Sequence, residues 1–277
     1  MRCYTPNYRC KTSLLRAFVE LLKQMAEYRW QIFVSIKNSI YTTYKQDVLG
    51  VFWSIVMPLI PMGIYIVLAH IKVFKTVDDM PFVFYIAVGM TVWLLMATTI
   101  HTGMHSIKKE KAVLKTTTYP IFVALLGRLG EVLHDTLIRL VVVAVVVLIF
   151  DVDVTVWSVA LFGISLLPAF VFGVALGMIF AIADLVVQDV RRVVTIALRY
   201  GLFVSSVIFP FPQTGLAAEI NKINVFNTYV NASRDLLYHG VIKQPLLYST
   251  TVAVTFALFL VAAKLVYSMD FKVREYL

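Results

Sequence analysis

Charged side chains interrupt the apolar runs of this chain at a few places, and these places are the candidates for chemistry. Arg128, Glu131, Asp135 and Arg139 are three or four residues apart. On a helix that turns about 100° per residue, all four lie within about 80° of one another and form one polar stripe. Ionisable groups inside a membrane are costly, so they pair with each other or face water. The stripe is therefore either a lattice of ion pairs near the headgroups or one wall of a hydrated route, and the sequence leaves both interpretations open.

Arg199 is the second candidate, because it lies seven residues beyond Arg192 and has no acidic residue one helical turn away on either side. Its guanidinium therefore needs a partner from another helix, or water. We interpret Arg199 as a cation that lines a hydrated route for phosphate or sugar, bordered by Tyr200, the next residue. The alternative is a structural ion pair with Asp184 or Glu131.

Nothing in the sequence predicts a catalytic centre. His101 and His105 share one helical face, but Thr102 occupies the position at which an HExxH zinc protease carries its glutamate, and no third ligand is evident. None of the 12 glycines begins a GxxxxGK[ST] loop, which predicts that the chain does not bind ATP itself. The acidic residues are scattered, which argues against a membrane-embedded glycosyl or acyl transferase. We therefore expect no catalytic, cofactor-binding or metal-binding residues.

The composition indicates that these groups sit in a membrane. Of the 277 residues, 60% are hydrophobic and only 15% are charged, and the mean hydropathy is +0.83. Such a chain has too little polar surface to cover a water-soluble globule of this size. We therefore predict an all-α integral membrane protein that forms a single domain over residues 1–277.

Six apolar segments are long enough to serve as transmembrane helices, since a span needs about 20 residues. They cover residues 51–70, 82–104, 128–150, 156–183, 194–210 and 247–267. The domain then divides into an N-terminal segment (1–50), six spans (51–267) and a tail (268–277). Gly173 and Gly177 are four residues apart in the fourth span, which predicts close packing against another helix.

Basic residues fix the expected direction of the spans. With a cytosolic N-terminus, seventeen Lys and Arg fall in inside segments, at positions 2, 9, 11, 16, 23, 29, 37, 45, 108, 109, 111, 115, 191, 192, 264, 272 and 274. Five fall in outside connections, namely Lys72, Lys75, Lys222, Arg234 and Lys243. The positive-inside rule then predicts that both termini are cytosolic. The same distribution explains the net charge of +9 without a nucleic-acid partner.

Two segments outside the spans also carry structural signals. Residues 13–45 mix apolar and charged residues at helical spacing, which predicts an amphipathic helix in the headgroup plane; a soluble helix packed on a partner is the alternative. Arg29, Lys37 and Lys45 are the expected contacts to lipid phosphate. Residues 211–246, between the fifth and sixth spans, predict two short helices that re-enter the outer leaflet.

The residues from Tyr44 to Pro58, with Leu49-Gly50 and Trp53 between them, resemble a motif of the permease subunits of ABC exporters for lipid-linked polysaccharide, which export O-antigen, capsule and teichoic acid. We expect Phe52 and Trp53, near the cytosolic end of the first span, to border the substrate pathway together with Arg199 and Tyr200, because sugars stack on aromatic rings and a cation attracts phosphate.

Two further regions resemble this family. The loop at residues 105–120 stands where the family has the coupling helix that docks on the ATPase subunit, which implies contacts through Lys111, Val113, Leu114 and Lys115. Residues 224–237 resemble the re-entrant pair that gates the outer mouth, which implies a gate at Asn224, Phe226, Tyr229 and Arg234. Val225 replaces the usual proline of this motif, so the start of the helix need not be the one that the family has. Gln188-Asp189 stands where the family commonly has Arg-Asp.

The resemblance implies a transport subunit of the bacterial cytoplasmic (inner) membrane and not an enzyme. It implies a homodimer around a central channel, bound to two copies of an ATPase subunit that carries ATP and Mg, with a lipid-linked glycan as cargo. An ABC exporter of the same architecture for drugs or lipids is the main alternative, and a membrane-embedded transferase is the other. The sequence does not identify the glycan or its lipid carrier.

Overall fold

The computed structural model describes residues 9, 12–45, 52, 56, 60, 63, 80–117, 119–210 and 215–276. The regular elements within these residues are helices, which confirms the predicted all-α class. In chain order they are α1 (Leu14–Glu27), α2 (Arg29–Lys45), α4 (Phe82–Lys109), α5 (Lys111–Thr116), α6 (Ile121–Ile149), α7 (Val156–Val186), α8 (Asp189–Gly201), the 3₁₀ turn η2 (Leu202–Val204), α9 (Leu216–Ile223), α10 (Val225–His239) and α11 (Pro245–Tyr276).

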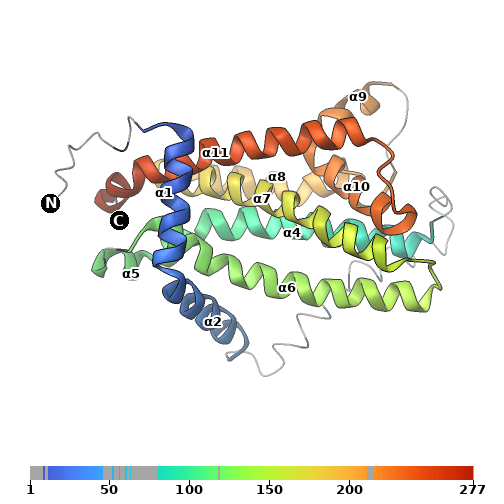
Figure 1. The fold of residues 1–277 in the computed structure, drawn as a ribbon, viewed down its shortest axis with the longest axis horizontal. Coiled ribbons are helices and arrows are strands. Elements are labelled where there is room, and N and C mark those ends of the chain that lie inside the picture. The colour runs from blue at the N-terminus through green and yellow to red at the C-terminus, as the bar shows by residue number, and fades with distance from the viewer. Residues whose placement is uncertain are drawn as a thin grey trace.

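Four of these helices form the body of the molecule. Figure 1 shows α4, α6, α7 and α11 running side by side, with α1 and α5 at one end. Each of the four is long and apolar enough to cross a membrane, which confirms the second, third, fourth and sixth predicted spans. The first predicted span, residues 51–70, lies outside the described part of the chain except at positions 52, 56, 60 and 63.

Helix α4 is the centre of this bundle. Within the chain, 89% of the apolar core of α4 is buried, compared with 22% for α11, so α4 is enclosed by other helices and α11 is mostly uncovered by the rest of the chain. A Cβ atom on Gly173 would lie 2.8 Å from Thr99 Cβ, and one on Gly177 would lie 3.1 Å from Gly103 Cα. The two glycines of α7 therefore let α7 approach α4 closely, as their spacing predicted.

The fifth predicted span, residues 194–210, does not form one continuous helix. Helix α8 begins earlier, at Asp189, and ends at Gly201, after which the chain makes the 3₁₀ turn η2 and stays non-helical to Pro210. Ser205 Oγ donates a hydrogen bond to Gly201 O (2.8 Å), and Ser206 has a left-handed backbone with φ of 49°. The apolar run continues through this bend, which is why hydropathy did not reveal it.

The N-terminal segment forms two helices instead of the predicted single one, because the chain bends at Tyr28. Ser13 caps α1, its Oγ accepting a hydrogen bond from Arg16 N. Helix α1 then packs on α11, where the Phe18 ring meets Phe256 and Phe259 edge to face at 6.4 and 6.0 Å. Helix α1 is amphipathic, with Ala17 and Leu21 buried, and large apolar side chains remain exposed on both helices, among them Leu15, Val19, Leu22, Trp30 and Phe33. Its place in the headgroup plane stays a prediction.

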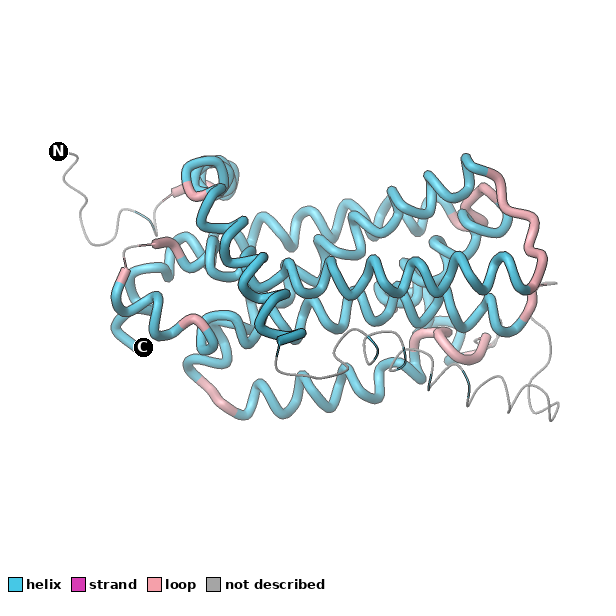
Figure 2. The backbone as a smooth tube through the Cα atoms, turned by 90° about the horizontal axis from the view of Figure 1, so that it is seen from below, coloured by secondary structure: helices cyan, strands magenta, loops and turns pink. Residues whose placement is uncertain are grey.

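Asp270, in the last turns of α11, ties the N-terminal segment to the start of α6. Its Oδ1 accepts a hydrogen bond from Ile121 N (3.1 Å), and its Oδ2 accepts one from Arg9 Nη1 (2.7 Å). The Arg9 guanidinium also lies over the rings of Tyr267 and Phe271. Figures 1 and 2 both place the C-terminal end of α11 at the same end of the bundle as α1, so the beginning and the end of the described chain meet there.

Candidate functional site

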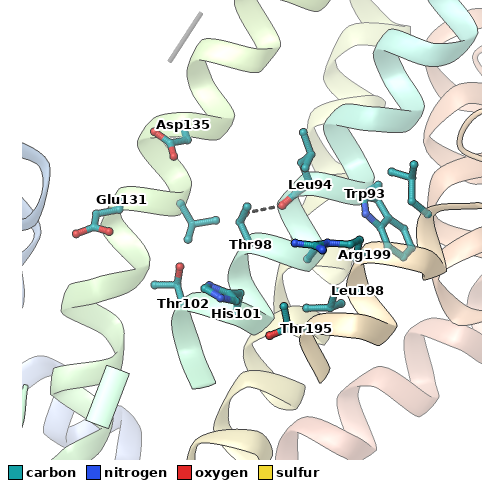
Figure 3. Close-up of a pocket in the computed structure, with 13 residues that line it drawn as sticks. Trp93, Leu94, Thr98, His101, Thr102, Glu131, Asp135, Thr195, Leu198 and Arg199 are labelled. Atoms are coloured by element: carbon teal, nitrogen blue, oxygen red, sulfur yellow. Dashed lines mark hydrogen bonds between the residues drawn. The ribbon is translucent and has the colours of Figure 1, made fainter. Parts of the chain in front are cut away.

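An open pocket of about 430 Å³ lies between α4, α6 and α8. We call it the polar pocket, because ionisable and hydroxyl side chains line much of it. Those side chains are Thr98, His101, Thr102, Glu131, Asp135, Thr195 and Arg199. Figure 3 shows that Arg199 comes from α8, Glu131 and Asp135 come from α6, and His101 comes from α4. The pocket therefore brings together the two carboxylates of the predicted stripe and the predicted pathway cation.

Arg199 is exposed and makes no ion pair within 4 Å with any residue that the structure describes. Both partners that the sequence suggested are engaged elsewhere. Glu131 pairs with Arg128 (3.2 Å), and Asp184 pairs with two other cations. Among the described residues, the ion-pair alternative for Arg199 is therefore excluded. Tyr200 is 60% exposed but is not among the residues that line the polar pocket.

The carboxylate of Asp184 joins three helices at the α5 end of the bundle. Asp184 is fully buried at the end of α7. Arg191 of α8 donates to both of its oxygens, Nε to Oδ1 at 3.2 Å and Nη2 to Oδ2 at 2.9 Å. Lys108 of α4 pairs with Oδ2 (2.8 Å) and donates to the backbone carbonyl of Asp184 (2.9 Å). The ends of α4, α7 and α8 are thus linked three residues before α5 begins.

The predicted stripe on α6 divides into two parts. Arg128 pairs with Glu110, between α4 and α5, at 2.7 Å and with Glu131 at 3.2 Å, as the ion-pair interpretation predicts. Asp135 lines the polar pocket, as the hydrated-route interpretation predicts. Arg139 is 8% exposed and does not line the pocket. Glu131 thus belongs both to the ion pair and to the pocket lining, and the hydrated route stays a prediction.

Trp93 of α4 is a site residue that sequence reasoning missed. It lines the polar pocket and also a second, mainly apolar pocket of about 400 Å³ between α4, α7, α8 and α10. Its ring lies 4.9 Å from that of Phe226, and a Cβ on Gly201 would lie 2.9 Å from Trp93 Cη2. Helical spacing places Trp93 about two turns before His101 and toward the same side of α4, which is the one signal in the sequence that could have indicated it.

The predicted gate residues lie on α10, inside the bundle. Asn224 caps α10, since its Oδ1 accepts hydrogen bonds from Phe226 N and Asn227 N. The helix therefore begins at Val225, the position at which the motif usually has proline, and the start of the helix is the one that the motif implies. Tyr229 is fully buried, and its hydroxyl shares a hydrogen bond with Thr255 at 2.5 Å.

The predicted coupling residues form the short helix α5. Lys111 and Lys115 are exposed, and Val113 is 41% exposed. Leu114 is only 1% exposed and belongs to the hydrophobic core of the chain itself. The structure therefore offers Val113, and not Leu114, as an apolar contact for a partner.

The remaining predicted site residues lie in the N-terminal part. Arg29 and Lys37 are exposed on α2, and Phe52 is exposed. The side chain of Lys45 and the whole of Trp53 lie outside the described residues, as do Leu49, Gly50 and Pro58. His101 and His105 stack edge to face, with ring centroids 4.4 Å apart. In the part of the chain that the structure describes, no three His, Cys, Asp or Glu side chains come together as metal ligands.

Comparisons with known proteins agree with this arrangement. The family model described as ABC-2 type transporter matches residues 30–238, from the start of α2 to the end of α10. The chain is also similar to the O-antigen export system permease protein RfbA of Myxococcus xanthus, with 22% identity over 192 residues, which is 69% of this chain and 73% of the relative.

Proposed function

This chain belongs to the ABC-2 type transporter family, and on that premise we propose that it is the membrane-spanning permease subunit of an ATP-driven exporter for a lipid-linked polysaccharide. The family is one of transport subunits and not of enzymes. The observation that carries the proposal is Arg199, a cation on α8 with no ion pair to a described residue, facing a polar pocket between apolar helices. Such a charge is costly in a membrane unless it serves a hydrated path.

The chemistry of the polar pocket suits a glycan. Carboxylates of Glu131 and Asp135 accept hydrogen bonds from sugar hydroxyl groups, and the threonine hydroxyls both donate and accept. Arg199 supplies donors to a sugar oxygen or to phosphate. Because the pocket holds two carboxylates for one arginine, it favours the hydroxyl-rich part of the cargo over a polyanionic one.

In this proposal the chain has six spans, the two beyond the four described candidates being residues 51–70 and the α8 region. It works as a homodimer in the bacterial inner membrane, with both termini and α5 in the cytosol. Two copies of a separate ATPase subunit bind ATP and Mg. Their movement reaches the permease through α5, while α9 and α10 form the re-entrant segment at the outer end. Arg29, Lys37 and Lys45 hold the diphosphate of the lipid carrier at the membrane surface.

Deletion of the gene in its own host tests this function. We expect the surface polysaccharide to disappear and polymer to accumulate on its lipid carrier inside the cell. A plasmid that encodes the permease should restore export only when the ATPase subunit is also present. If the deletion strain keeps a normal surface polysaccharide and becomes sensitive to small lipophilic compounds, the chain is instead an exporter of drugs or lipids.

A single-cysteine labelling experiment tests the orientation. After Cys3 and Cys10 are replaced by Ser, a cysteine at Lys111 should be protected from an impermeant maleimide in intact cells, and a cysteine at Lys243 should react. Labelling at position 111 with protection at 243 would invert the proposed topology.

A further inference from the structure

Arg234 of α10 is the most deeply buried basic side chain in the described part of the protein, with 2% of its surface exposed. Its guanidinium is bound almost entirely by backbone carbonyls. Nε donates to Tyr85 O at 2.9 Å, Nη1 to Ser206 O at 2.7 Å and to Asn231 Oδ1 at 3.2 Å, and Nη2 to Val207 O at 2.7 Å. One side chain thus joins α10, the start of α4 and the bend after η2.

No carboxylate of the described residues lies within 4 Å of this arginine to balance its charge. The neighbouring Asp235 accepts a hydrogen bond from Lys243 N instead. Two other groups stabilise the positive charge of the guanidinium. The carbonyl oxygens that follow α8 and η2 lie at the negative end of the helix dipole, and the centroid of the Tyr85 ring lies 3.5 Å from Arg234 Cζ. The arginine therefore stays buried only while the bend is in place.

The bend in turn depends on the arginine. Residues 205–207 are not helical, so their carbonyls have no partner along the helix, and an unpaired carbonyl in a membrane interior is costly. Ser206 also holds a left-handed backbone, which is strained for a residue with a side chain. Tyr85 Oη donates a second hydrogen bond to Ser206 O (2.8 Å). Arg234 and Tyr85 together satisfy the carbonyls that the end of the helix exposes.

The guanidinium lies directly against the backbone of Gly89. A Cβ atom on Gly89, one turn after Tyr85, would lie 1.9 Å from Arg234 Nη2 and 3.0 Å from Val207 O. Gly89 therefore provides the space in which the guanidinium meets the bend. A lysine at position 234 would bring one ammonium group in place of the planar fork, and it could not reach three carbonyls on two segments at once.

We infer that Arg234 is a positioning residue that fixes the bend at residues 205–207 against α4, and so sets the place of α8 and of the Arg199 side chain beside the polar pocket between transport cycles. This inference rests on the proposed function for its meaning in transport, but the contacts themselves do not depend on the cargo. Arg234 does not contact the cargo in this role. It holds α8, which carries Arg199, the proposed contact to the cargo.

The test uses a cysteine reporter in the bend. The purified exporter with its ATPase, in lipid nanodiscs that expose both faces, carries Cys3→Ser, Cys10→Ser and Val207→Cys, and the reagent is a water-soluble maleimide. Val207 is fully buried, so this thiol should react slowly. With Arg234→Lys, labelling should rise about tenfold or more, the change expected when one charge-assisted hydrogen bond is lost.

Three controls separate this role from a general loss of stability. Arg199→Lys, which changes an exposed arginine, should leave Val207→Cys protected. Val123→Cys, a fully buried reporter on α6, should stay protected in the Arg234→Lys protein, because the release is local. Gly89→Ala displaces the guanidinium while Arg234 itself is kept, so it should also make position 207 reactive. Gly163→Ala is its control, because a Cβ atom at position 163 would meet no atom within 4 Å, and it should leave position 207 protected.

The inference is overturned if position 207 is equally protected in wild type, Arg234→Lys and Gly89→Ala, or if positions 207 and 123 become reactive together. If the Arg234→Lys protein does not accumulate, the comparison is made with Gly89→Ala instead. The inference is then wrong if position 207 is as protected in Gly89→Ala as in wild type, or if positions 207 and 123 become reactive together. Export by the unmodified complex is measured separately. A wild-type complex that moves no glycan would contradict the proposed function and leave the labelling result unaffected.

Discussion

Gly103 and Gly177 face each other across α4 and α7 so closely that a methyl group on Gly103 would lie 2.9 Å from Gly177 Cα. Backbone, and not a flexible side chain, occupies that space, so the two helices cannot admit a side chain there without moving apart. Both helices also carry site residues, Trp93 and His101 on α4 and Asp184 at the end of α7. The distance between α4 and α7 at this contact therefore determines how far Trp93 and His101 lie from Asp184.

Gly103→Ala should destabilise the folded permease by about 1–3 kcal/mol, the usual cost of overpacking a tight contact. Gly163→Ala in the same helix as Gly177 meets no atom within 4 Å and should be neutral or slightly stabilising, because alanine favours helix. Thermal unfolding in detergent, followed by size-exclusion chromatography, measures both. Equal midpoints for the two variants would show that α4 and α7 separate at no cost.

Asp184→Asn should be strongly destabilising, because it leaves Lys108 and Arg191 as unbalanced cations around a buried amide. We expect a loss of about 3 kcal/mol, at the lower end of the range for a broken buried pair, since water reaches both cations. Asp189→Asn is the matched control. Its pair with Arg192 is long (3.7 Å), and both side chains are largely exposed, so the unfolding midpoint should not change. A midpoint for Asp184→Asn equal to that of the control would mean that the three helix ends are held by other contacts.

Val113→Asp and Leu114→Asp should fail in different ways. Val113 is exposed on α5, so its replacement should leave the permease folded and reduce co-purification with the ATPase subunit. Leu114 is buried, and a carboxylate there should lower the yield of folded permease itself. Yield and co-purification are measured on the same preparations. If Val113→Asp binds the ATPase normally, α5 is only a connection between α4 and α6.

Arg199→Ala should reduce glycan export with little change in the amount of folded protein, because the arginine pairs with no described carboxylate. Arg128→Ala should instead lower the folded amount, since it leaves Glu110 and Glu131 without their shared cation. Export is quantified as surface polysaccharide and folded amount as the monodisperse fraction after extraction. An export defect in Arg199→Ala that merely follows a loss of protein would remove Arg199 from the pathway.

Val225→Pro should be tolerated, because the first position of a helix accepts proline and Asn224 already has an extended backbone with φ of −76° and ψ of 102°. Asn224→Ala should cost about 1 kcal/mol through the lost cap. It also removes the hydrogen bonds from Asn224 Nδ2 to Val204 O and Ser205 Oγ. Thermal unfolding of the two variants compares them. A larger loss for Val225→Pro than for Asn224→Ala would show that α10 does not begin at this residue.

The sequence predicted the parts of the fold that depend on local pattern. Helices α4, α6, α7 and α11 are recognisable because each buries its backbone polar groups within one long apolar run. The α8 region is also apolar to Pro210, but it bends where Arg234 and Tyr85, distant in sequence, satisfy its carbonyls. Hydropathy along the chain contains no information about such partners.

Arg234 was counted among the residues of an outside connection, because a charged residue between spans is normally exposed. Its burial depends on carbonyls 27 and 28 residues earlier and on the space at Gly89, which no local pattern indicates. The same limit applies at α5. The helix was predicted, but which of Val113 and Leu114 faces the core depends on how the bundle surrounds it. Trp93 was missed because one aromatic residue in a span is ordinary.

Because Asp270 lies on α11, the contacts that it makes with Arg9 and with the start of α6 can form only after α11 has been synthesised. Asp270, which caps the start of α6 and binds Arg9, lies on α11, far along the chain from both partners. While the ribosome makes α6 through α10, the first amide of α6 and the Arg9 guanidinium lack this carboxylate. The end of the bundle beside α5 therefore lacks these two contacts until α11 has been synthesised. A permease that lacks α11 thus differs from the folded protein at the surface where we propose that the ATPase binds, so binding of the ATPase would depend on α11.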